Sequence, residues 1–412
     1  MPLYDISAGM VYALLFVSLY FEVFMLVSFL EHLFARRAPK APTVGEMYEP
    51  SVAIVVPCFN EATGIRATIE SLLALKYPKE KLDIIVVDDG STDATYSIAR
   101  TFESRGVRVF SKENGGKHTA MNFALARTDA ELIGCLDADS IVKPDALLHV
   151  VAAFCDTRVA AVTPAIHVKE PTTLLQHLQE VEYRLALFNR FVLASLGSAF
   201  ITPGPFSFFR AAVVRSLGGW HYAHSTEDME MAMRIQDAGY AIANVPHAHV
   251  YTTTPRTLRR LYRQRVRWTY GFIQNLRDYR HMLGNIEFGN LGIFILPITL
   301  ISIGTGMFFF IRMVANVITS ALHAYTRYNL TRTLPYYHFD LFYINTSALM
   351  FLVTACVALI IGLIAAGSWI GHESRRPPLS TPIFILFYGF IAPLWLFTAV
   401  ARAWLRTGVR WR

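Results

Sequence analysis

The sequence predicts an α/β domain with a mostly parallel sheet, joined to α-helical transmembrane segments and to amphipathic interface helices. Three observations lead to this prediction. Between residues 51 and about 250, short apolar runs alternate with helical patterns, as expected of strands that return to a parallel sheet. Other segments are apolar over the roughly 20 residues that a helix needs to cross a bilayer. Residues 257–280 interleave arginines with apolar side chains, a pattern typical of a basic amphipathic stretch.

The composition points to a membrane protein with a water-soluble part. The 412 residues are 53% hydrophobic and 17% charged, and the mean hydropathy is +0.36. The chain is therefore too apolar for an ordinary soluble protein and too charged for one that is wholly embedded. The formal net charge is +7, with basic residues gathered at 256–280 and 402–412. We interpret this charge as attraction to anionic lipid and phosphate, not as nucleic-acid binding.

The cysteines show no C-x-x-C spacing, which argues against a zinc site or a disulfide framework. We expect all four to be buried, reduced thiols. They are Cys58, Cys135, Cys155 and Cys356.

The elements of the α/β domain are expected in regular order. The expected strands are residues 52–56, 84–87, 107–110 and 132–136. The expected helices are residues 62–75, 94–104 and 117–126. Ile65, Ile69 and Leu72 share one face of the first helix, and Thr92 or Asp93 is the expected N-cap of the second.

Two carboxylates spaced i, i+2, Asp137 and Asp139, follow the last of these strands. In open α/β sheets ligands bind beyond the carboxyl ends of the strands, so both acids lie where a ligand is expected. Carboxylates so placed suit a hard divalent cation that bridges a diphosphate. Alone, a D-x-D at the end of a strand is also common in turns.

The D-x-D belongs to an ordered set of six motifs. They are VAIVVPCFNE (52–61), VDDGSTD (87–93), NGGK (114–117), DAD (137–139), TED (226–228) and QRVRW (264–268). This set resembles the membrane-bound, processive members of glycosyltransferase family 2, which include the synthases of cellulose, chitin, hyaluronan and poly-N-acetylglucosamine. The resemblance covers about residues 50–280 and implies a GT-A-like nucleotide-sugar domain. Several of those relatives have two N-terminal spans where this chain has one expected span.

The resemblance implies a UDP-sugar site. It assigns Asp88 and Asp89 to the uracil or ribose of the donor, with capping of the D-G-S turn as the alternative. Lys117, after two glycines at an expected helix start, would bind the donor phosphates; a surface lysine is the other interpretation. Asp139, and Asp137 with it, would hold Mg²⁺ or Mn²⁺ against the diphosphate, while Asp137 has the ribose as a second possible partner.

The acceptor side is also implied by the resemblance. Asp228 looks like the general base that takes the proton of the acceptor hydroxyl during an inverting, in-line displacement. Glu227 is the second choice, and residues 225–228 also read as a helix N-cap with first-turn acids. Arg267 would bind the diphosphate. Trp268, in the same motif as Gln264, would stack on a sugar of the acceptor, although an Arg-Trp pair on a basic helix also suits a membrane-interface anchor.

Three further residues have weaker assignments. Gly204, in Gly204-Pro205-Phe206, matches the family's position near the acceptor terminus. His247 and His249 flank Ala248 on an expected strand, and we interpret both as structural histidines.

The membrane segments leave one conflict in topology. The first expected span, residues 6–30, contains Glu22, which should face a protein partner or a cavity unless it is protonated or near the span's end. Arg36, Arg37 and Lys40 follow this span, which places the next residues in the cytosol by the positive-inside rule. Further spans are expected at residues 291–311, 341–366 and 381–400.

Four crossings would put the basic tail outside. The residues concerned are Arg402, Arg406, Arg410 and Arg412. We therefore expect residues 291–318 to be bent or re-entrant, because they contain Pro297 and the Gly304-Thr305-Gly306 break; an exceptional tail is the alternative.

These expectations define a plan for the whole chain. Residues 1–40 would be an N-terminal membrane anchor, 50–255 a cytosolic GT-A domain, 256–285 an amphipathic interface region, and 286–412 a C-terminal transmembrane region. The protein would lie in the plasma or inner membrane as a multi-pass protein. As an inverting, metal-dependent enzyme, it would extend a polysaccharide from a UDP-sugar and release it through its spans.

Two other functions stay open at this stage. One is the addition of a single sugar to a lipid-linked acceptor. The other is a non-catalytic transporter or scaffold with an inactive transferase domain, against which the intact acids at 137, 139 and 228 argue. Expected partners are the UDP-sugar donor, the polysaccharide or lipid acceptor and membrane lipids, without nucleic acid. Accessory subunits or a homo-oligomer remain possible partners.

Overall fold

The computed structural model describes residues 3–35, 48–333, 347–371 and 376–405. Within it, one eight-stranded sheet has the order β3-β2-β1-β4-β7-β6-β8-β5. The strands are β1 Val52–Cys58, β2 Leu82–Asp88, β3 Arg108–Ser111, β4 Leu132–Cys135, β5 Ser140–Val142, β6 Val159–Val168, β7 Ser207–Arg210 and β8 Ala241–Thr252.

The sheet is mixed, with a parallel half and a second half that reverses direction. Strands β3, β2, β1 and β4 pair in parallel, as do β6 and β8. Strand β7 runs antiparallel to both β4 and β6, and β5 runs antiparallel to β8. The prediction of an α/β domain with a mostly parallel sheet is confirmed, and the sequence pattern had not indicated the antiparallel strands.

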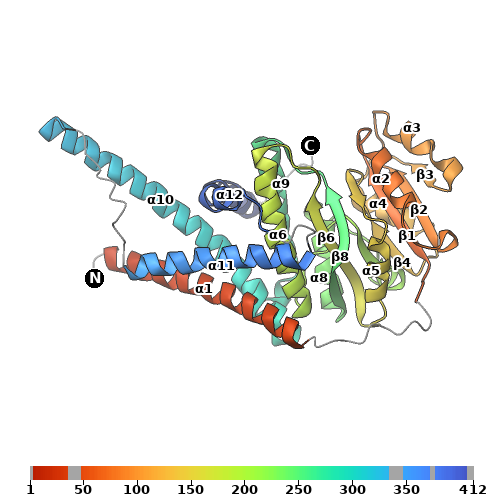
Figure 1. Ribbon diagram of the computed structural model, residues 1–412, viewed down its shortest axis with the longest axis horizontal. Helices are drawn as coiled ribbons and strands as arrows, with labels where there is room; N and C mark the ends of the chain where they lie inside the picture. The colour runs from red at the N-terminus through yellow and green to blue at the C-terminus, as the bar shows by residue number, and fades with distance from the viewer. Residues whose placement is uncertain (1–2, 36–47, 334–346, 372–375, 406–412) are drawn as a thin grey trace.

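Helices cover both faces of this sheet (Figure 1). The helices are α1 Leu3–Ala35, α2 Ile65–Leu73, α3 Thr95–Arg100, α4 Lys117–Leu125, α5 Ala146–Ala153, α6 Leu174–Ser195, α7 Ala211–Ser216, α8 Glu227–Asp237, α9 Leu258–Asp278, α10 Leu296–Thr331, α11 Ala348–Gly371 and α12 Thr381–Leu405. The N-cap of α3 is Ala94, so the prediction of Thr92 or Asp93 is wrong. Asp93 lies one residue earlier, and its Oδ1 accepts from the amide of Thr95 at 2.9 Å.

The central strands are continuous apolar runs because both of their faces are buried. Ile54 points to one face and packs in a cluster with Ile69 of α2. Its neighbour Val55 points to the other face and packs in a cluster with Met121 of α4. The sheet thus forms the middle layer of the domain, and its carboxyl edge is fixed between two packed layers of helices.

Four helices of the described chain are long and apolar enough to cross a membrane. They are Gly9–Phe34, Leu291–Thr331, Ala348–Gly371 and Thr381–Leu405. Figure 1 shows α1 and α11 side by side, while α10 projects away from the sheet. With these helices the chain is a membrane protein. Of the basic residues used above for its sidedness, Arg402 lies in α12. The others lie outside the described residues; they are Arg36, Arg37, Lys40, Arg406, Arg410 and Arg412.

The predicted break within residues 291–318 is wrong. Leu291–Ile295 forms a π-helical turn, and α10 then continues without interruption past Gly304 and Gly306. Pro297 lies in the first turn of α10, where its missing N–H removes no necessary hydrogen bond. Isolated glycines weaken a helix but do not stop one.

Three of the cysteines are buried, but Cys155 is exposed, so the prediction that all four are buried is wrong at that position. All four are free thiols. Glu22 is partly buried in α1, and its Oε2 is enclosed without a hydrogen-bond partner. This carboxylate therefore faces the protein interior, as expected.

Helix α6 joins the α/β domain to the candidate spans. One side of α6 packs on β6 and β8, and other sides contact α11, α12 and α1. Arg184 of α6 pairs with Glu180 at 2.6 Å and donates to Ser368 of α11 at 3.1 Å. Its side chain also donates to the carbonyl of Arg376. The sheet and the spans are consequently parts of one packed structure.

The basic helix α9 buries its apolar face against protein. Val266 packs in a cluster with Tyr388 and Trp395 of α12, and Phe272 packs with Met229 of α8. The amphipathic pattern over 257–280 thus predicted the helix correctly. Its apolar side chains are covered by a candidate span and by α8 within the protein.

Candidate active site

The acids of three motifs lie at the carboxyl edge of the parallel strands. In the register of the sheet, Cys58 of β1 pairs with Asp88 of β2, and Val55 pairs with Cys135 of β4. Strands β1, β2 and β4 therefore end at the same edge. Asp88 and Asp89 lie at the end of β2, and Asp137 follows β4 by two residues.

Asp88 and Asp89 are both buried and are occupied by hydrogen bonds within the protein. Asp88 Oδ2 accepts from the amide of Ser91 at 3.2 Å and from the hydroxyl of Ser111 at 3.2 Å. The contacts of Asp88 therefore agree with the alternative interpretation, in which this carboxylate caps the D-G-S turn.

Asp89 holds the loop that leads into α4. Its two carboxylate oxygens accept from the amides of Gly115 and Gly116 at 3.0 and 2.7 Å, and Lys112 Nζ lies 2.6 Å away. Gly116 has a φ of 90°, a conformation that favours glycine. Asp89 thereby positions the first residue of α4, Lys117.

Lys117 connects the D-x-D acids to the T-E-D acids. Its Nζ lies 2.5 Å from Asp137 Oδ1 and 3.9 Å from Glu227 Oε1. Burial alone would lower the pKa of the ammonium, but Asp137, Glu227 and Asp228 raise the pKa of Lys117 well above its usual value. Lys117 is therefore a permanent cation among three carboxylates from distant parts of the sequence.

Asp139 is partly buried, close to Asp137. Burial raises the pKa of its carboxyl to about 6, and the nearby Asp137 adds to the shift. The hydroxyls of Ser140 and Thr252 donate to its Oδ1 at 3.0 and 3.4 Å. Gly64 packs against the same segment, since a Cβ on it would lie 2.7 Å from the Ala138 carbonyl.

Asp228 lies in the first turn of α8. Burial raises the pKa of its carboxyl to about 6; Glu227 adds to this shift, while Lys117 and Arg267 oppose it. Its Oδ1 accepts from the amide of Met229 at 2.9 Å. Its backbone carbonyl accepts from the Thr202 hydroxyl at 2.6 Å, which ties the start of α8 to the chain before β7.

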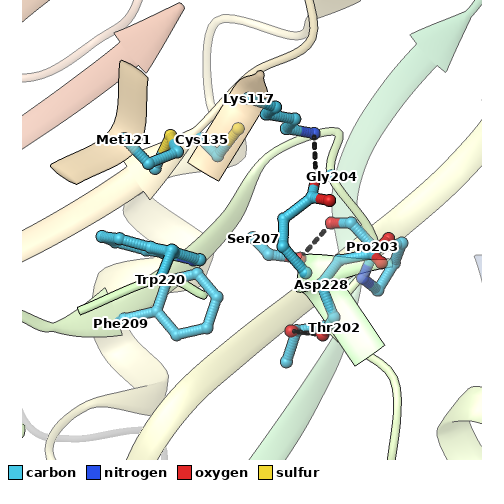
Figure 2. A pocket seen from close by; sticks show the side chains of 11 residues that line it. Lys117, Met121, Cys135, Thr202, Pro203, Gly204, Ser207, Phe209, Trp220 and Asp228 are labelled. Atoms are coloured by element: carbon cyan, nitrogen blue, oxygen red, sulfur yellow. Dashed lines mark hydrogen bonds and ion pairs between the residues drawn. The ribbon is translucent and has the colours of Figure 1, made fainter. Parts of the chain in front are cut away.

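A small pocket lies beside these acids. Its lining residues are Lys117, Met121, Cys135, Thr202, Pro203, Gly204, Ser207, Phe209, Trp220, Glu227 and Asp228. Figure 2 shows Trp220 and Phe209 together on one side and Asp228 and Pro203 on the other. The rings of Trp220 and Phe209 meet edge to face, with centroids 5.6 Å apart. The pocket thus has an aromatic wall opposite its ionisable groups.

Gly204 is the point of closest approach to the Lys117–Asp137 pair. A Cβ at this position would lie 2.3 Å from Lys117 Nζ and 2.7 Å from Asp137 Oδ2. The backbone therefore passes so near the two charged groups that a side chain would displace them.

The Q-x-x-R-W motif lies on α9, where Arg265 is more deeply buried than Arg267. Arg265 pairs with Glu182 of α6 at 2.6 Å and lies 4.3 Å above the ring of Trp268. It also donates to Gln264 Oε1 at 3.3 Å. Trp268 is 37% exposed, so Arg265 covers one face of the ring and the side chain still reaches solvent.

The structure brings together most of the predicted site residues. Lys117, Asp137, Glu227, Asp228 and Arg267 interact electrostatically as one group. Asp88 and Asp89 instead lie beneath the loop before α4. The two predicted structural histidines lie apart from this group, where His249 Nδ1 is hydrogen bonded to His167 Nε2 at 3.0 Å.

Several lining residues were not predicted from the sequence. Thr202, Cys135 and Trp220 line the pocket, and Glu182 fixes Arg265. Thr202 lies two residues before Gly204, the nearest signal that the sequence offered. Cys135 and Trp220 belong to ordinary apolar patterns, and no motif surrounds Glu182.

The D-x-D fits a divalent cation only with help from other ligands. Among the described residues, no group of three or more His, Cys, Asp or Glu side chains is arranged to hold a metal ion. Asp137 and Asp139 offer carboxylate oxygens, the donors that Mg²⁺ and Mn²⁺ prefer. Both hydroxyls that bond Asp139 go to Oδ1. A cation here would need water and diphosphate oxygens as further ligands.

Known proteins resemble both the sequence and the fold. Residues 50–271 match the family described as glycosyltransferase like family 2. Poly-beta-1,6-N-acetyl-D-glucosamine synthase of Staphylococcus aureus (strain COL) is 30% identical over 266 residues, covering 63% of this chain and 64% of the relative. The synthase of that name from Staphylococcus epidermidis is 27% identical over the same length. The match thus spans less than two thirds of these relatives.

A solved structure shares the fold over nearly the whole chain. The mannosyltransferase PcManGT from Pyrobaculum calidifontis, in complex with GDP-Man and Mn²⁺, has a TM-score of 0.56 at 20% identity, covering 96% of this chain and 99% of that one. The family match extends over more than half of the chain and includes all six ordered motifs up to the arginine and tryptophan of α9. The chain belongs to glycosyltransferase family 2, and its α/β domain is GT-A-like.

Proposed function

We propose that this protein transfers a sugar from a UDP-sugar to a growing polysaccharide, with inversion at the anomeric carbon. The observation that carries the proposal is the position of Lys117, which lies 2.5 Å from Asp137 and 3.9 Å from Glu227. This contact supports a single site to which both the D-x-D and the T-E-D of the sequence contribute. Such a site supplies what the reaction needs: ligands for a diphosphate and its cation, with a base beside them.

The donor side is formed by residues from β4, α4 and α9. Asp137 and Asp139 would hold Mg²⁺ or Mn²⁺, which when bound stabilises the charge that develops on the leaving diphosphate. Lys117 and Arg267 would bind the diphosphate oxygens, the first as a point charge and the second as a planar fork. Asp88 and Asp89 would reach the nucleoside from beneath the loop before α4.

Asp228 would act as the general base. The acceptor hydroxyl oxygen attacks the anomeric carbon, its proton passes to Asp228, and the bond to the diphosphate breaks with the electron pair on the leaving oxygen. Burial raises the pKa of Asp228 to about 6. A carboxylate with that pKa is a stronger base than an ordinary one, and it is still mostly ionised at pH 7.

The acceptor would lie against α9, beside the candidate spans. Trp268, Gln264 and Glu227 would contact the acceptor, with the sugar on the ring face that Arg265 leaves free. Helix α9 packs along α12, so an acceptor at Trp268 would have a membrane-spanning helix beside it. We therefore place the enzyme in the plasma or inner membrane as a multi-pass protein. Its catalytic domain would face the cytosol, with export of the polymer alone or with accessory subunits or further copies.

Product size tests this proposal directly. Membranes that contain the protein are incubated with Mn²⁺ and a panel of radiolabelled UDP-sugars, with GDP-mannose as a further donor, and the products are sized. We expect a high-mass polymer from a UDP-sugar, and none from the Asp139→Asn or Asp228→Asn variants. A lipid carrying one sugar would replace the polysaccharide proposal by the single-addition alternative. The absence of transfer from every donor would overturn both.

A further inference from the structure

Arg265, the second residue of the Q-x-x-R-W motif, is held by two helices outside α9. Its Nη2 donates to Oε2 of Glu182 in α6 at 2.6 Å. The same carboxylate oxygen accepts from the hydroxyl of Tyr388 in α12. The Arg265 side chain is 5% exposed, and Tyr388 is buried as well. One carboxylate thus joins α6, α9 and the candidate span α12 in an enclosed group of hydrogen bonds.

Arg265 also contacts the other residues of its own motif. Its Cζ lies 4.3 Å from the centroid of the Trp268 ring, and its Nη1 donates to Gln264 Oε1 at 3.3 Å. Residues three apart are neighbours on the surface of a helix, so this stack runs along α9. A planar guanidinium is attracted to an aromatic face and stacks on it. The orientation of the Trp268 ring therefore depends on where Arg265 is held.

Glu182 determines the position of Arg265. Burial alone would lower the pKa of the Arg265 guanidinium, but Glu182 raises this pKa above its usual value. A buried arginine that loses its carboxylate carries an uncompensated charge, which favours movement of the guanidinium toward water. Such a movement would take Arg265 off the Trp268 ring or carry the ring with it. A change at Glu182 should therefore reach Trp268 through Arg265.

Helix α6 carries a second pair of the same kind in a different part of the protein. Glu180 lies 2.6 Å from Arg184, whose side chain is also 5% exposed. Arg184 donates to Ser368 of α11 at 3.1 Å. Both pairs support the packing of α6, but of the two it is the Glu182 pair that includes a residue of the Q-x-x-R-W motif. Glu180 therefore provides a comparison for the effects of Glu182.

We propose that Glu182 and Tyr388 are positioning residues for the acceptor, which act through Arg265 to hold the Trp268 ring in the orientation that receives a sugar. This inference rests on the proposed function, in which Trp268 stacks on the acceptor. Neither positioning residue would touch the substrate. Since Tyr388 belongs to α12, the same contacts would align the acceptor site with that candidate span.

The first test measures the constants for acceptor and donor separately in the purified full-length protein. The donor is the radiolabelled UDP-sugar that the wild type uses, and the acceptors are short oligosaccharides obtained from the wild-type product by partial acid hydrolysis. We expect Glu182→Gln to raise the KM for acceptor about three- to tenfold and to leave the KM for donor unchanged. Tyr388→Phe, which keeps the ion pair, should have a smaller effect in the same direction. Glu180→Gln is the matched control and should change neither constant.

A double-mutant cycle shows whether Glu182 acts through Trp268. If it does, Glu182→Gln should not raise the KM for acceptor any further in a Trp268→Ala protein. Effects that multiply would mean that the two residues act independently. That result would overturn the inference and leave the proposed function standing.

A second double variant separates positioning from folding. Glu182→Gln alone leaves the charge of Arg265 unbalanced and should lower Tm, whereas Glu182→Gln combined with Arg265→Met removes both charges and should restore Tm. Trp268 would still lack its guanidinium, so the KM for acceptor should stay raised. A return of both Tm and this KM to the wild-type values would show that the pair serves only the fold, and the inference would fail.

A measurement without substrate distinguishes this inference from the proposed function. The protein is labelled with 5-fluorotryptophan, and the fluorine resonance of Trp268 is identified by its loss in Trp268→Phe. We expect this resonance to shift or broaden in Glu182→Gln and to stay unchanged in Glu180→Gln. An unchanged resonance in Glu182→Gln would refute the inference, whatever sugar the protein transfers. A changed resonance in a protein whose wild type transfers no sugar would refute the acceptor role together with the proposed function.

Discussion

The ammonium of Lys117 lies 2.5 Å from Oδ1 of Asp137, which joins the first residue of α4 to the segment that follows β4. The same ammonium lies 3.9 Å from Glu227 at the start of α8. Three separate elements thus meet at one cation. The charge balance of the candidate site depends on this contact, and changes in its neighbours should affect donor binding and transfer differently.

Asp228→Asn should abolish transfer and leave donor binding intact. The amide keeps the shape of the side chain but accepts no proton, so the rate should fall about 10²- to 10⁴-fold. Transfer is measured with radiolabelled donor, and donor affinity by calorimetry. Asp237→Asn, at the exposed end of the same helix, is the matched control. Near-normal turnover in Asp228→Asn would show that the base is another group.

The rate should depend on pH through the same carboxyl. Because burial raises the pKa of Asp228 to about 6, the ionised base is lost as pH falls below that value. We expect kcat/KM to be level between pH 7 and 8 and to decline about tenfold for each unit below about 6. An inflection near pH 4 would contradict the assignment.

The stability of the protein should change with pH in the opposite sense. A carboxyl whose pKa is raised in the folded state binds its proton more tightly there than in the unfolded chain. Its contribution to stability is therefore present below about pH 4 and lost as pH rises through about 6. Asp228→Asn should consequently raise Tm at pH 7.5, and a lower Tm there would argue against a desolvated carboxylate.

Gly204→Ala should impair transfer without unfolding the protein. The new Cβ would lie 2.3 Å from Lys117 Nζ and must displace the ends of two flexible side chains. Since a displacement of about 1 Å in a catalytic site can reduce the rate about 100-fold, we expect a loss of that order with an unchanged circular dichroism spectrum. Gly304→Ala, where a Cβ meets no atom within 4 Å, is the control.

Asp89→Asn should loosen the loop before α4. The carboxylate accepts from the amides of Gly115 and Gly116 and pairs with Lys112. We expect a loss of about 1–3 kcal/mol in the free energy of unfolding, together with weaker donor binding. Chemical denaturation measures the first and calorimetry the second. Asp83→Asn, near the other end of β2, breaks a partly exposed ion pair and should change stability by less than about 1 kcal/mol.

Trp268→Ala should affect the acceptor more than the donor. Arg265 already covers one face of the ring at 4.3 Å, so a sugar would stack on the opposite face. Loss of this contact should raise the KM for acceptor roughly tenfold and leave the KM for donor unchanged, with Trp268→Phe in between. An equal change in both constants would indicate that Trp268 supports the fold of α9 instead.

The sequence predicted the parallel half of the domain because its signals are local. Strands β1, β2 and β4 are apolar runs buried on both faces, and α4 begins at Lys117, as its Gly-Gly entry had indicated. The D-x-D begins two residues after the end of β4. Each of these features depends on residues that are neighbours in the chain.

The remaining features depend on partners far apart in the sequence. Strand β7 joins β4 to β6 in antiparallel pairs, and no short pattern specifies that reversal. Arg265 pairs with Glu182, which lies 83 residues earlier in the sequence. The Q-x-x-R-W motif by itself therefore gave no sign that this arginine is structural. Helix α6 was not predicted from the sequence. It contacts the sheet on one side and candidate spans on other sides, so its sequence lacks the single polar stripe that marks an amphipathic helix.

The contacts of α6 also impose an order on biosynthesis. Arg184 is bonded to Ser368, 184 residues later, so α6 leaves the ribosome long before its partners on α11 exist. In the proposed multi-pass arrangement, the nascent transferase domain would expose Phe188 and Phe191 until the late spans are inserted, whereas both are buried in the finished protein. Maturation therefore ends at the bilayer, and a domain expressed alone would be expected to require a detergent or a chaperone to stay dispersed.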